Sequence, residues 1–228
     1  YDAGELWHLF DTRWEMPLTK MPSESINSKR LNRYTTLILP DGNYNRINEN
    51  GVKHVKDFVR SGGTLIVFGQ AIRWVNSKGL TRWKFDNSAN KSTAARPYAA
   101  YADDRGAQVI GGAVFSTRLD LTHPVNFGYV DEDLPVFKRG TLFIKPTKNV
   151  YATPQIFTAN PLKSGYISSK NAALLSESAN VVVGGYGSGK VIAINSLPNF
   201  RAFWMGTNKT LANAVFFGAL INGGTVER

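Results

Sequence analysis

The segments Thr35-Thr-Leu-Ile-Leu-Pro-Asp-Gly42 and Ser61-Gly-Gly-Thr-Leu-Ile-Val-Phe-Gly69, with the residues between them, determine the expected fold. Each contains a continuous apolar run of strand length, Thr35–Leu39 and Thr64–Phe68, as strands buried on both faces do. Between these runs, Asn48–Arg60 carries apolar residues on one face of a predicted helix. A strand, a helix and a second strand in this order indicate parallel strands joined by a right-handed crossover.

The rest of the chain extends this pattern outward. A helical start follows at Gln70–Val75, and residues 76–111 have no clear period. Further segments of strand length are Ala113–Leu119, Pro135–Phe137, Thr141–Ile144, Val150–Phe157, Val181–Val183 and Lys190–Ile194, with helices at Ser168–Ser178 and Thr207–Leu220. The sequence therefore predicts one α/β domain over residues 1–228. Its sheet should be flavodoxin-like, open and mostly parallel, with helices on both faces and β-rich additions in the second half.

The beginning of the chain does not complete such a sheet. Doubly wound sheets normally start with a strand, whereas residues 3–14 place apolar side chains at helical spacing. The chain also starts at Tyr1 instead of a methionine. We therefore expect the first strand to lie upstream of Tyr1 and the sequence to be a fragment of a longer polypeptide.

Composition excludes several classes of protein. The 228 residues are 43% hydrophobic and 19% charged, which is typical of a globular domain and not of a disordered or fibrous chain. The apolar runs are far shorter than the roughly 18–20 residues that span a bilayer, so we expect no membrane contact. Because the chain has no cysteine, it holds no disulfide, no thiolate zinc site and no cysteine nucleophile.

The net charge of +10 is spread evenly over the chain, with one local concentration. Residues 73–101 contain six basic side chains, Arg73, Lys78, Arg82, Lys84, Lys91 and Arg96, and the aromatic residues Trp74, Trp83, Phe85 and Tyr98 lie among them. One interpretation is a module that binds a polyanion, either nucleic acid or an acidic polysaccharide. The other is a surface excursion that its tryptophans attach to the core. Since the sequence has no recognisable nucleic-acid module, we do not expect nucleic acid as the partner.

One glycine-rich segment has the spacing of a phosphate-binding loop but not its context. Gly184-Gly-Tyr-Gly-Ser-Gly-Lys190 matches the glycines and the lysine of such a loop. However, Val191 stands where the loop needs a serine or threonine for magnesium, and Val191–Ile194 continues as a strand instead of a helix. We therefore interpret the segment as the turn of a β-hairpin.

The three histidines predict no metal site, so we expect no cofactor in this chain. His8 and Asp11 distantly resemble a pair of zinc ligands one helical turn apart, but no third ligand has a matching spacing. His54 lies among lysines of a predicted helix, where solvation is expected, and His123 belongs to a turn before Pro124.

Candidate ligand-binding residues follow the ends of the predicted strands, because open α/β sheets bind ligands beyond the carboxyl ends of their strands. These candidates are Asp41, Gly42, Gln70, Arg73, Asn199 and Arg201. Arginine in such a place favours a carboxylate or another anion, so we expect an anionic small molecule or a peptide as the ligand. Helix capping and turn hydrogen bonds explain the same polar groups equally well.

The turn after Thr64–Phe68 is also where such folds present a nucleophile. Here the turn reads Gly69-Gln70-Ala71, and alanine has no nucleophilic atom. We therefore predict no catalytic residue in this chain.

The segments that open this section resemble the core of class I glutamine amidotransferase-like domains. In that family the second strand leads into G-x-C-x-G, with the cysteine at the turn. Here Ala71 replaces the cysteine and Arg73 replaces the second glycine, so the resemblance does not imply amidotransferase activity.

A closer resemblance is to the C-terminal amidotransferase-like domain of bacterial carboxypeptidase A-type zinc peptidases. Four segments that span nearly the whole chain carry it: Asp2–Arg13, Phe68–Trp74, Leu121–Tyr129 and Asn199–Asn208. It implies a non-catalytic accessory domain that positions substrate or has a structural role. The zinc and its ligands would lie in an upstream peptidase domain, a hydrolase, which would be the partner of this domain in a periplasmic or secreted protein.

Overall fold

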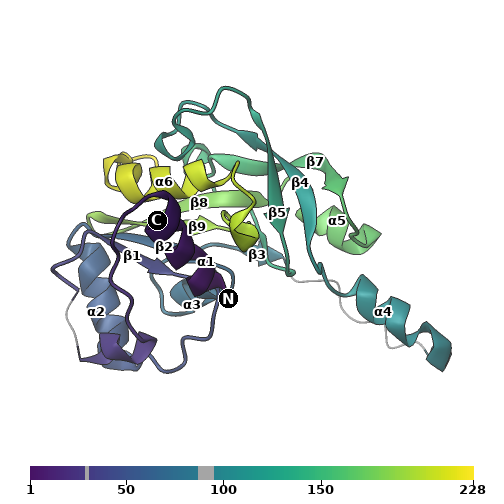
Figure 1. Cartoon of the computed structure of the whole chain (residues 1–228), viewed down its shortest axis with the longest axis horizontal. Helices are drawn as coiled ribbons and strands as arrows, with labels where there is room; N and C mark the ends of the chain where they lie inside the picture. The colour runs from purple at the N-terminus through teal and green to yellow at the C-terminus, as the bar shows by residue number, and fades with distance from the viewer. Residues whose placement is uncertain (29–30, 87–94) are drawn as a thin grey trace.

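A mixed β-sheet forms the centre of the computed structural model, which describes residues 1–28, 31–86 and 95–228 (Figure 1). Within those residues, nine strands join one sheet. Seven of them follow the order β1-β2-β9-β8-β7-β4-β5, while β6 pairs with β8 and β3 pairs with β6. The strands are β1 (Thr36–Leu39), β2 (Thr64–Phe68), β3 (Phe85–Asp86), β4 (Ala113–Leu119), β5 (Asp133–Lys138), β6 (Phe143–Ile144), β7 (Gln155–Ser164), β8 (Ala179–Tyr186) and β9 (Gly189–Ile194).

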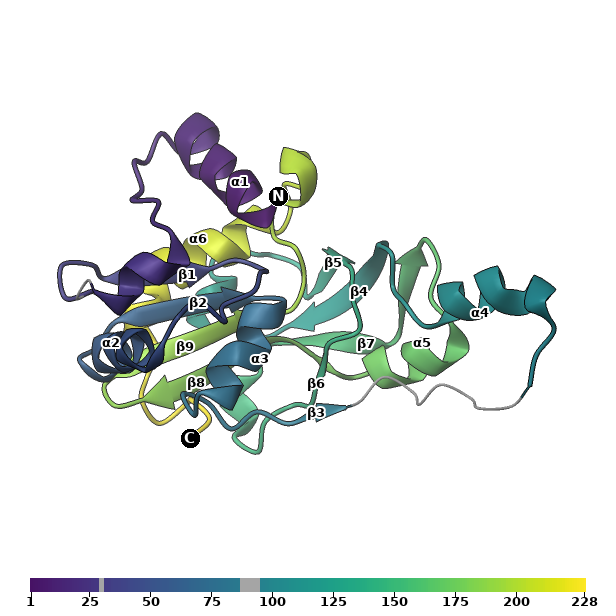
Figure 2. The ribbon, with the colours of Figure 1, turned by 90° about the horizontal axis from the view of Figure 1, so that it is seen from below.

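Helices pack against this sheet, apart from Tyr101–Ala107, which Figure 2 shows projecting away from it. The α-helices of the described residues are α1 (Asp2–His8), α2 (Glu49–Arg60), α3 (Gln70–Ser77), α4 (Tyr101–Ala107), α5 (Ser169–Leu175) and α6 (Asn208–Phe217). A π-helical turn, η1 (Leu9–Arg13), continues α1, and a 3₁₀ turn, η6 (Phe200–Ala202), precedes α6. None of the described helices is long and apolar enough to cross a membrane.

The parallel part of the sheet is built around β2, which lies between β1 and β9. All five residues of β2 are buried. Leu65 and Val67 pack in one hydrophobic cluster with α2 and α3, whereas Ile66 and Phe68 pack in another with α1 and α6. Because successive side chains of a strand point to opposite faces, this continuous apolar run requires cover on both sides, as Figure 2 shows.

The remainder of the sheet is antiparallel, and the predicted flavodoxin-like or amidotransferase-like, mostly parallel sheet is wrong. Of the strand pairs that the structure describes, β1–β2 and β2–β9 are parallel, and the other six are antiparallel. The strand–helix–strand rhythm that predicted parallel pairing occurs once, through α2. The strands that follow α3 extend the same sheet, and apart from the β2–β9 pair their described pairings are antiparallel.

The antiparallel strands pack around a separate hydrophobic cluster at the far end of the sheet. Phe115, Phe143 and Phe157 pack there with Leu175 of α5. Register shifts between β4 and β7 mark bulges, which increase the local twist and curl this part of the sheet (Figure 1).

The glycine-rich segment forms the predicted hairpin turn. β8 and β9 pair antiparallel as far as Tyr186 and Gly189, and Gly187 and Ser188 make the turn. A Cβ atom on Gly189 would lie 2.1 Å from the carbonyl oxygen of Val59 at the end of α2. The glycine at this position therefore allows β9 to pack closely against α2 and serves no phosphate.

We predict that Gly189→Ala lowers the free energy of unfolding by about 3 kcal/mol or more, because the new methyl group meets backbone atoms that cannot move aside. Gly106→Ala in α4 is the matched control, since nothing lies within 4 Å of its added Cβ. Urea unfolding measures both variants. Equal stability of the two variants would contradict the close packing of β9 on α2.

Candidate functional site

A cavity of about 260 Å³ opens where the carboxyl ends of β1, β2 and β9 meet. The segments before β4 and after β5 supply the facing wall. Its charged and amide- or hydroxyl-bearing lining residues include Asp41, Gln70, Arg73, Arg139, Asn195 and Ser196. Because the two parallel pairings align three strand ends at one edge of the sheet, the topology itself creates this cavity.

Three of the candidate residues from the sequence meet in this cavity. Asp41 follows β1, whereas Gln70 and Arg73 belong to the first turn of α3 after β2. Gly42 lies next to Asp41 in the turn after β1 but does not line the cavity.

The two candidates placed after β9 lie elsewhere. Asn199 lines a separate hollow of about 20 Å³ beside α1, and its Nδ2 donates to the carbonyl oxygen of Glu5 at 2.8 Å. Arg201 is exposed, with its guanidinium carbon 5.3 Å from the ring centroid of Phe200. Asn199 therefore attaches its turn to α1, which is the turn-bonding role that the sequence left open.

Asp41 shapes the turn where a nucleophile would otherwise stand. Its Oδ1 accepts a hydrogen bond from the backbone N–H of Gln70 at 2.7 Å, so Asp41 caps α3 from the neighbouring strand. Gly69 has a φ of +51°, and a Cβ there would lie 2.3 Å from the Asp41 carboxyl carbon. Ala71 is fully buried in the cluster beneath α3 and presents nothing to the cavity.

Two arginines give the cavity its positive charge. The Arg73 guanidinium lies over the ring of Phe85, 5.1 Å from its centroid. Arg139 donates from Nη2 to both carboxylate oxygens of Asp2, each at 2.7 Å. Arg139 therefore already binds a carboxylate, supplied by α1, at the rim of the cavity.

Sequence reasoning missed Arg139 and Asn195. Asn195 directly follows β9, so the rule that locates ligands at strand ends indicates it, and choosing Asn199 and Arg201 placed the site several residues too late. Arg139 follows β5, which lies at the far end of the strand order from β1, and no local pattern in the sequence indicates that this segment returns to the cavity.

A fully buried lysine lies directly behind the cavity wall. Lys138 donates from Nζ to the side-chain oxygen of Asn195 at 2.9 Å. Burial lowers the pKa of Lys138 to about 7, although the negative charge of Asp41 opposes this shift. A further negative charge in the cavity would favour the protonated form of Lys138 for the same electrostatic reason.

The histidines do not converge, and the described residues contain no group of three or more His, Asp or Glu that could hold a metal ion. His123 is buried, and its Nδ1 accepts from the backbone N–H of Val125 at 3.2 Å. Burial lowers the pKa of His123 to about 4, against a smaller opposing effect of Asp120. His54, predicted to be solvated, is half-buried, with Nδ1 2.7 Å from the carbonyl oxygen of Ile26.

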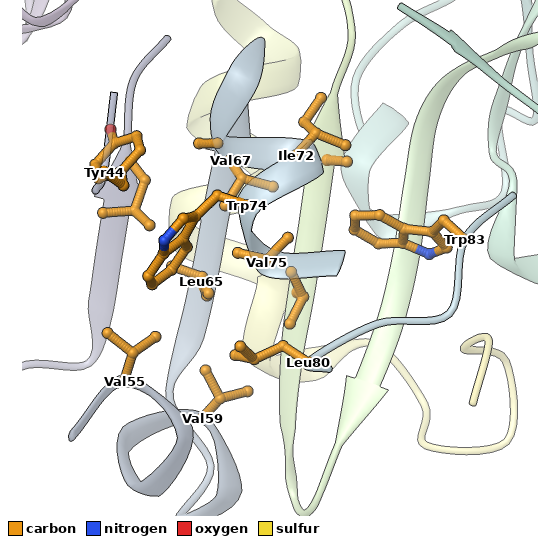
Figure 3. Packing of buried hydrophobic residues seen from close by; sticks show 14 of the residues in the cluster. Tyr44, Val55, Val59, Leu65, Val67, Ile72, Trp74, Val75, Leu80 and Trp83 are labelled. Carbon is orange, nitrogen blue, oxygen red and sulfur yellow. The ribbon is translucent and has the colours of Figure 1, made fainter. Parts of the chain in front are cut away.

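The basic aromatic stretch contributes its tryptophans to the core. Trp74 and Trp83 are 9% and 4% exposed, and Figure 3 shows both indoles among buried side chains around α3. Neither ring is free to stack on a base. Phe85 is half-buried and Tyr98 is exposed, whereas Lys91 lies outside the described residues.

The turn that follows the cavity is strained. Arg201 (φ 49°, ψ 30°) and Ala202 (φ 59°) are consecutive left-handed residues, each of which costs roughly 1–2 kcal/mol for a non-glycine residue. The Arg13 guanidinium donates to the carbonyl oxygen of Ala202, and Asn208 Nδ2 donates to that of Pro198 at 2.6 Å. Side chains from η1 and α6 therefore hold the turn in this shape.

Comparison with known proteins establishes the fold alone. Two solved structures share it: proteins described as ThuA-like from Parabacteroides merdae ATCC 43184 and from Bacteroides uniformis ATCC 8492. The first is 12% identical, with a TM-score of 0.60 over 99% of this chain and 86% of that one. The second is 12% identical, with a TM-score of 0.56 over 95% and 82%. No protein-family model and no curated protein matches the sequence.

The mixed sheet of this chain is thus of the kind found in these ThuA-like proteins, and it replaces the flavodoxin-like sheet expected from the sequence. At 12% identity, this similarity does not assign the functional roles of residues in those proteins to residues of this chain.

The buried lysine predicts a pH dependence of stability. Its pKa is about 7 in the folded chain and higher in the unfolded chain, so between these values the unfolded state binds more protons and folding becomes more favourable as pH rises. From pH 8 to pH 10, the free energy of unfolding of the wild type should rise relative to that of Lys138→Met by up to about 1.4 kcal/mol per pH unit.

Urea unfolding across this pH range measures the difference. Lys145→Met is the control, because the Lys145 side chain is 48% exposed. Parallel pH profiles of the wild type and Lys138→Met would contradict the lowered pKa.

Proposed function

We propose that this chain is a non-catalytic binding domain whose ligand is a small organic acid held in the cavity at the ends of β1, β2 and β9. The observation that carries the proposal is the convergence of Arg73 and Arg139 on one cavity, with Lys138 buried behind it. Cations in a partly desolvated cleft favour an anion far more than they do in water. The pair between Arg139 and Asp2 supports a carboxylate, since the same guanidinium already binds one.

The size of the cavity limits the ligand. Its volume of about 260 Å³ lies just below the range of roughly 300–1,000 Å³ that is usual for ligand pockets. A short organic acid suits this volume better than a nucleotide. The polar groups of Gln70, Asn195 and Ser196 would bind the remaining oxygens of such a ligand.

The function that we propose is ligand binding without catalysis. The turn between β2 and α3 supplies Gln70 and the buried Ala71 where a nucleophile would stand, and Asp41 is occupied in capping α3. Binding and positioning, not bond cleavage, are what these side chains support.

We also propose, from the sequence resemblance, that this binding domain is an accessory of an upstream zinc metallocarboxypeptidase in a periplasmic or secreted protein. The zinc would belong to that upstream domain. We expect the intact mass of the natural protein, with peptide mapping upstream of Tyr1, to reveal a chain much larger than 25.2 kDa that carries H-x-x-E and a later histidine. A natural product near 25.2 kDa would contradict the accessory role and leave the cavity proposal standing.

The alternative of a polyanion-binding module stays a prediction for residues 73–101. Burial of Trp74 and Trp83 leaves fewer rings for stacking than the sequence suggested. Affinity for single-stranded nucleic acid that falls steeply with salt would favour this alternative.

We predict that Arg73→Ala and Arg139→Ala each weaken binding of a dicarboxylate by about ten- to hundredfold, the range expected when one charged hydrogen-bonding group is lost. Calorimetric titration with succinate, glutarate and inorganic phosphate measures this effect. Thermal unfolding of each variant separates lost binding from lost folding.

The matched control is Arg60→Ala. Arg60 is the last residue of α2 and lies near the amino ends of β2 and β9, at the other end of these strands from the cavity. Its carbonyl oxygen accepts a hydrogen bond from the backbone N–H of Ser188 there. This variant should bind like the wild type. A wild type that binds none of the three anions, or an Arg73→Ala variant that binds as well as the wild type, would overturn the proposed function.

A further inference from the structure

An aromatic surface adjoins the cavity. We define the aromatic ledge as Phe137, Phe200, Phe203 and Trp204. Phe137 and Phe200 stack with ring centroids 3.7 Å apart and planes 13° from parallel. Phe203 meets Phe200 edge-on at 5.9 Å, and Trp204 meets Phe203 at 6.4 Å.

Two contacts join the ledge to the cavity wall. The Phe137 ring lies so close to Gly112 that a Cβ there would be 2.6 Å from its Cζ, and the neighbouring Gly111 lines the cavity. On the other side, the backbone N–H of Leu197, also a lining residue, donates to the carbonyl oxygen of Phe137 at 2.9 Å. The ledge therefore adjoins the cavity wall at these two places.

The ledge is exposed and fixed in place at the same time. Phe203 is 59% exposed, and Phe200 is half-buried. Both rings lie on or beside the strained turn that Arg13 and Asn208 hold. The strained turn with its two left-handed residues holds the exposed Phe203 ring in one defined position. Backbone strain of this kind is typical of functional sites.

We infer that the ligand of the cavity is a carboxylate that carries an aromatic or other large apolar group, and that this group packs on Phe203 and Phe200. The inference rests on the proposed function, because the carboxylate is the part of the ligand that Arg73 and Arg139 bind. The apolar group extends from the cavity along the ledge and removes the Phe203 ring from water.

This assignment follows from the chemistry of the two neighbouring surfaces. The cavity offers the guanidinium groups of Arg73 and Arg139, whereas the ledge is apolar and exposes the ring of Phe203. A ligand with its charge at one end and its apolar group at the other satisfies both surfaces. A free aromatic acid and the C-terminal residue of a peptide have this chemistry in common.

The experiment compares 3-phenylpropionate with butanoate, which has the charge without the ring, and with 3-phenylpropanamide, which has the ring without the charge. NMR titration measures their affinities down to the millimolar range. The wild type should bind 3-phenylpropionate more tightly than butanoate and should bind the amide weakest of all. Phe203→Ala should weaken binding of 3-phenylpropionate by about three- to tenfold, as one lost aromatic contact does, and leave butanoate unchanged.

Phe216→Ala is the matched control, because Phe216 is 56% exposed on α6 and lies outside the ledge. If Arg73→Ala loses both acids while Phe203→Ala and the control bind 3-phenylpropionate equally well, the inference about the ledge is wrong and the proposed function stands. If the wild type binds neither acid, the inference about the ledge is wrong, and the titrations with succinate, glutarate and phosphate decide whether the proposed function stands.

A short peptide ending in phenylalanine identifies the source of the carboxylate. Tighter binding of this peptide than of 3-phenylpropionate, lost when its C-terminus is amidated, indicates a peptide C-terminus. Weaker binding of the peptide indicates a free aromatic acid.

Discussion

The burial of β2 on both faces is the constraint on which the rest of the structure depends. Its four apolar residues need a layer of helices on each side, which α2 and α3 supply on one face and α1 and α6 on the other. They also need a strand on each edge, and β1 and β9 both pair with β2 in parallel. The carboxyl ends of β1, β2 and β9 therefore lie together at one end of the sheet, and α3 begins beside them.

The charges at that end of the sheet form one connected arrangement. Asp41 caps α3 and is also the negative charge that partly offsets the burial of Lys138. Lys138 in turn bonds Asn195, a residue of the cavity wall. Arg73 and Arg139 add two guanidinium groups around the same space, one of them bound by Asp2 from α1. An anion bound in this cavity, as we propose, would be attracted by the two guanidinium groups and repelled by Asp41, and the partly desolvated surroundings would strengthen both effects.

Local patterns in the sequence predicted the individual elements well where the side chains alone determine them. Thr64–Phe68 reads as a doubly buried strand because four apolar residues follow Thr64 without interruption. Asn48 caps the N-terminus of α2 by accepting the N–H of Gly51, as its residue type suggests. The hairpin at Gly187 also followed from the strand that continues after it.

What the sequence could not predict depends on pairing between distant segments. Parallel or antiparallel direction is set by the partner strand, so the rhythm of residues 35–77 led to a mostly parallel sheet. Of the described strands after α3, β9 pairs in parallel with β2, and every other pairing is antiparallel. The same limit applies to the site. Asp41, Gln70 and Arg73 follow strands that local patterns identify, whereas Arg139 reaches the cavity from β5, across the sheet.

The side-chain NMR spectrum of the arginines tests the central claim most directly, because it reports on each guanidinium of the folded chain separately. On titration with succinate, the Nε–Hε resonances of Arg73 and Arg139 should shift together and saturate, while that of Arg60 near the amino ends of β2 and β9 stays in place. An unchanged Arg139 resonance, with shifts at Arg82 and Arg96 instead, would contradict the account, because the anion would then bind the basic stretch and not the cavity.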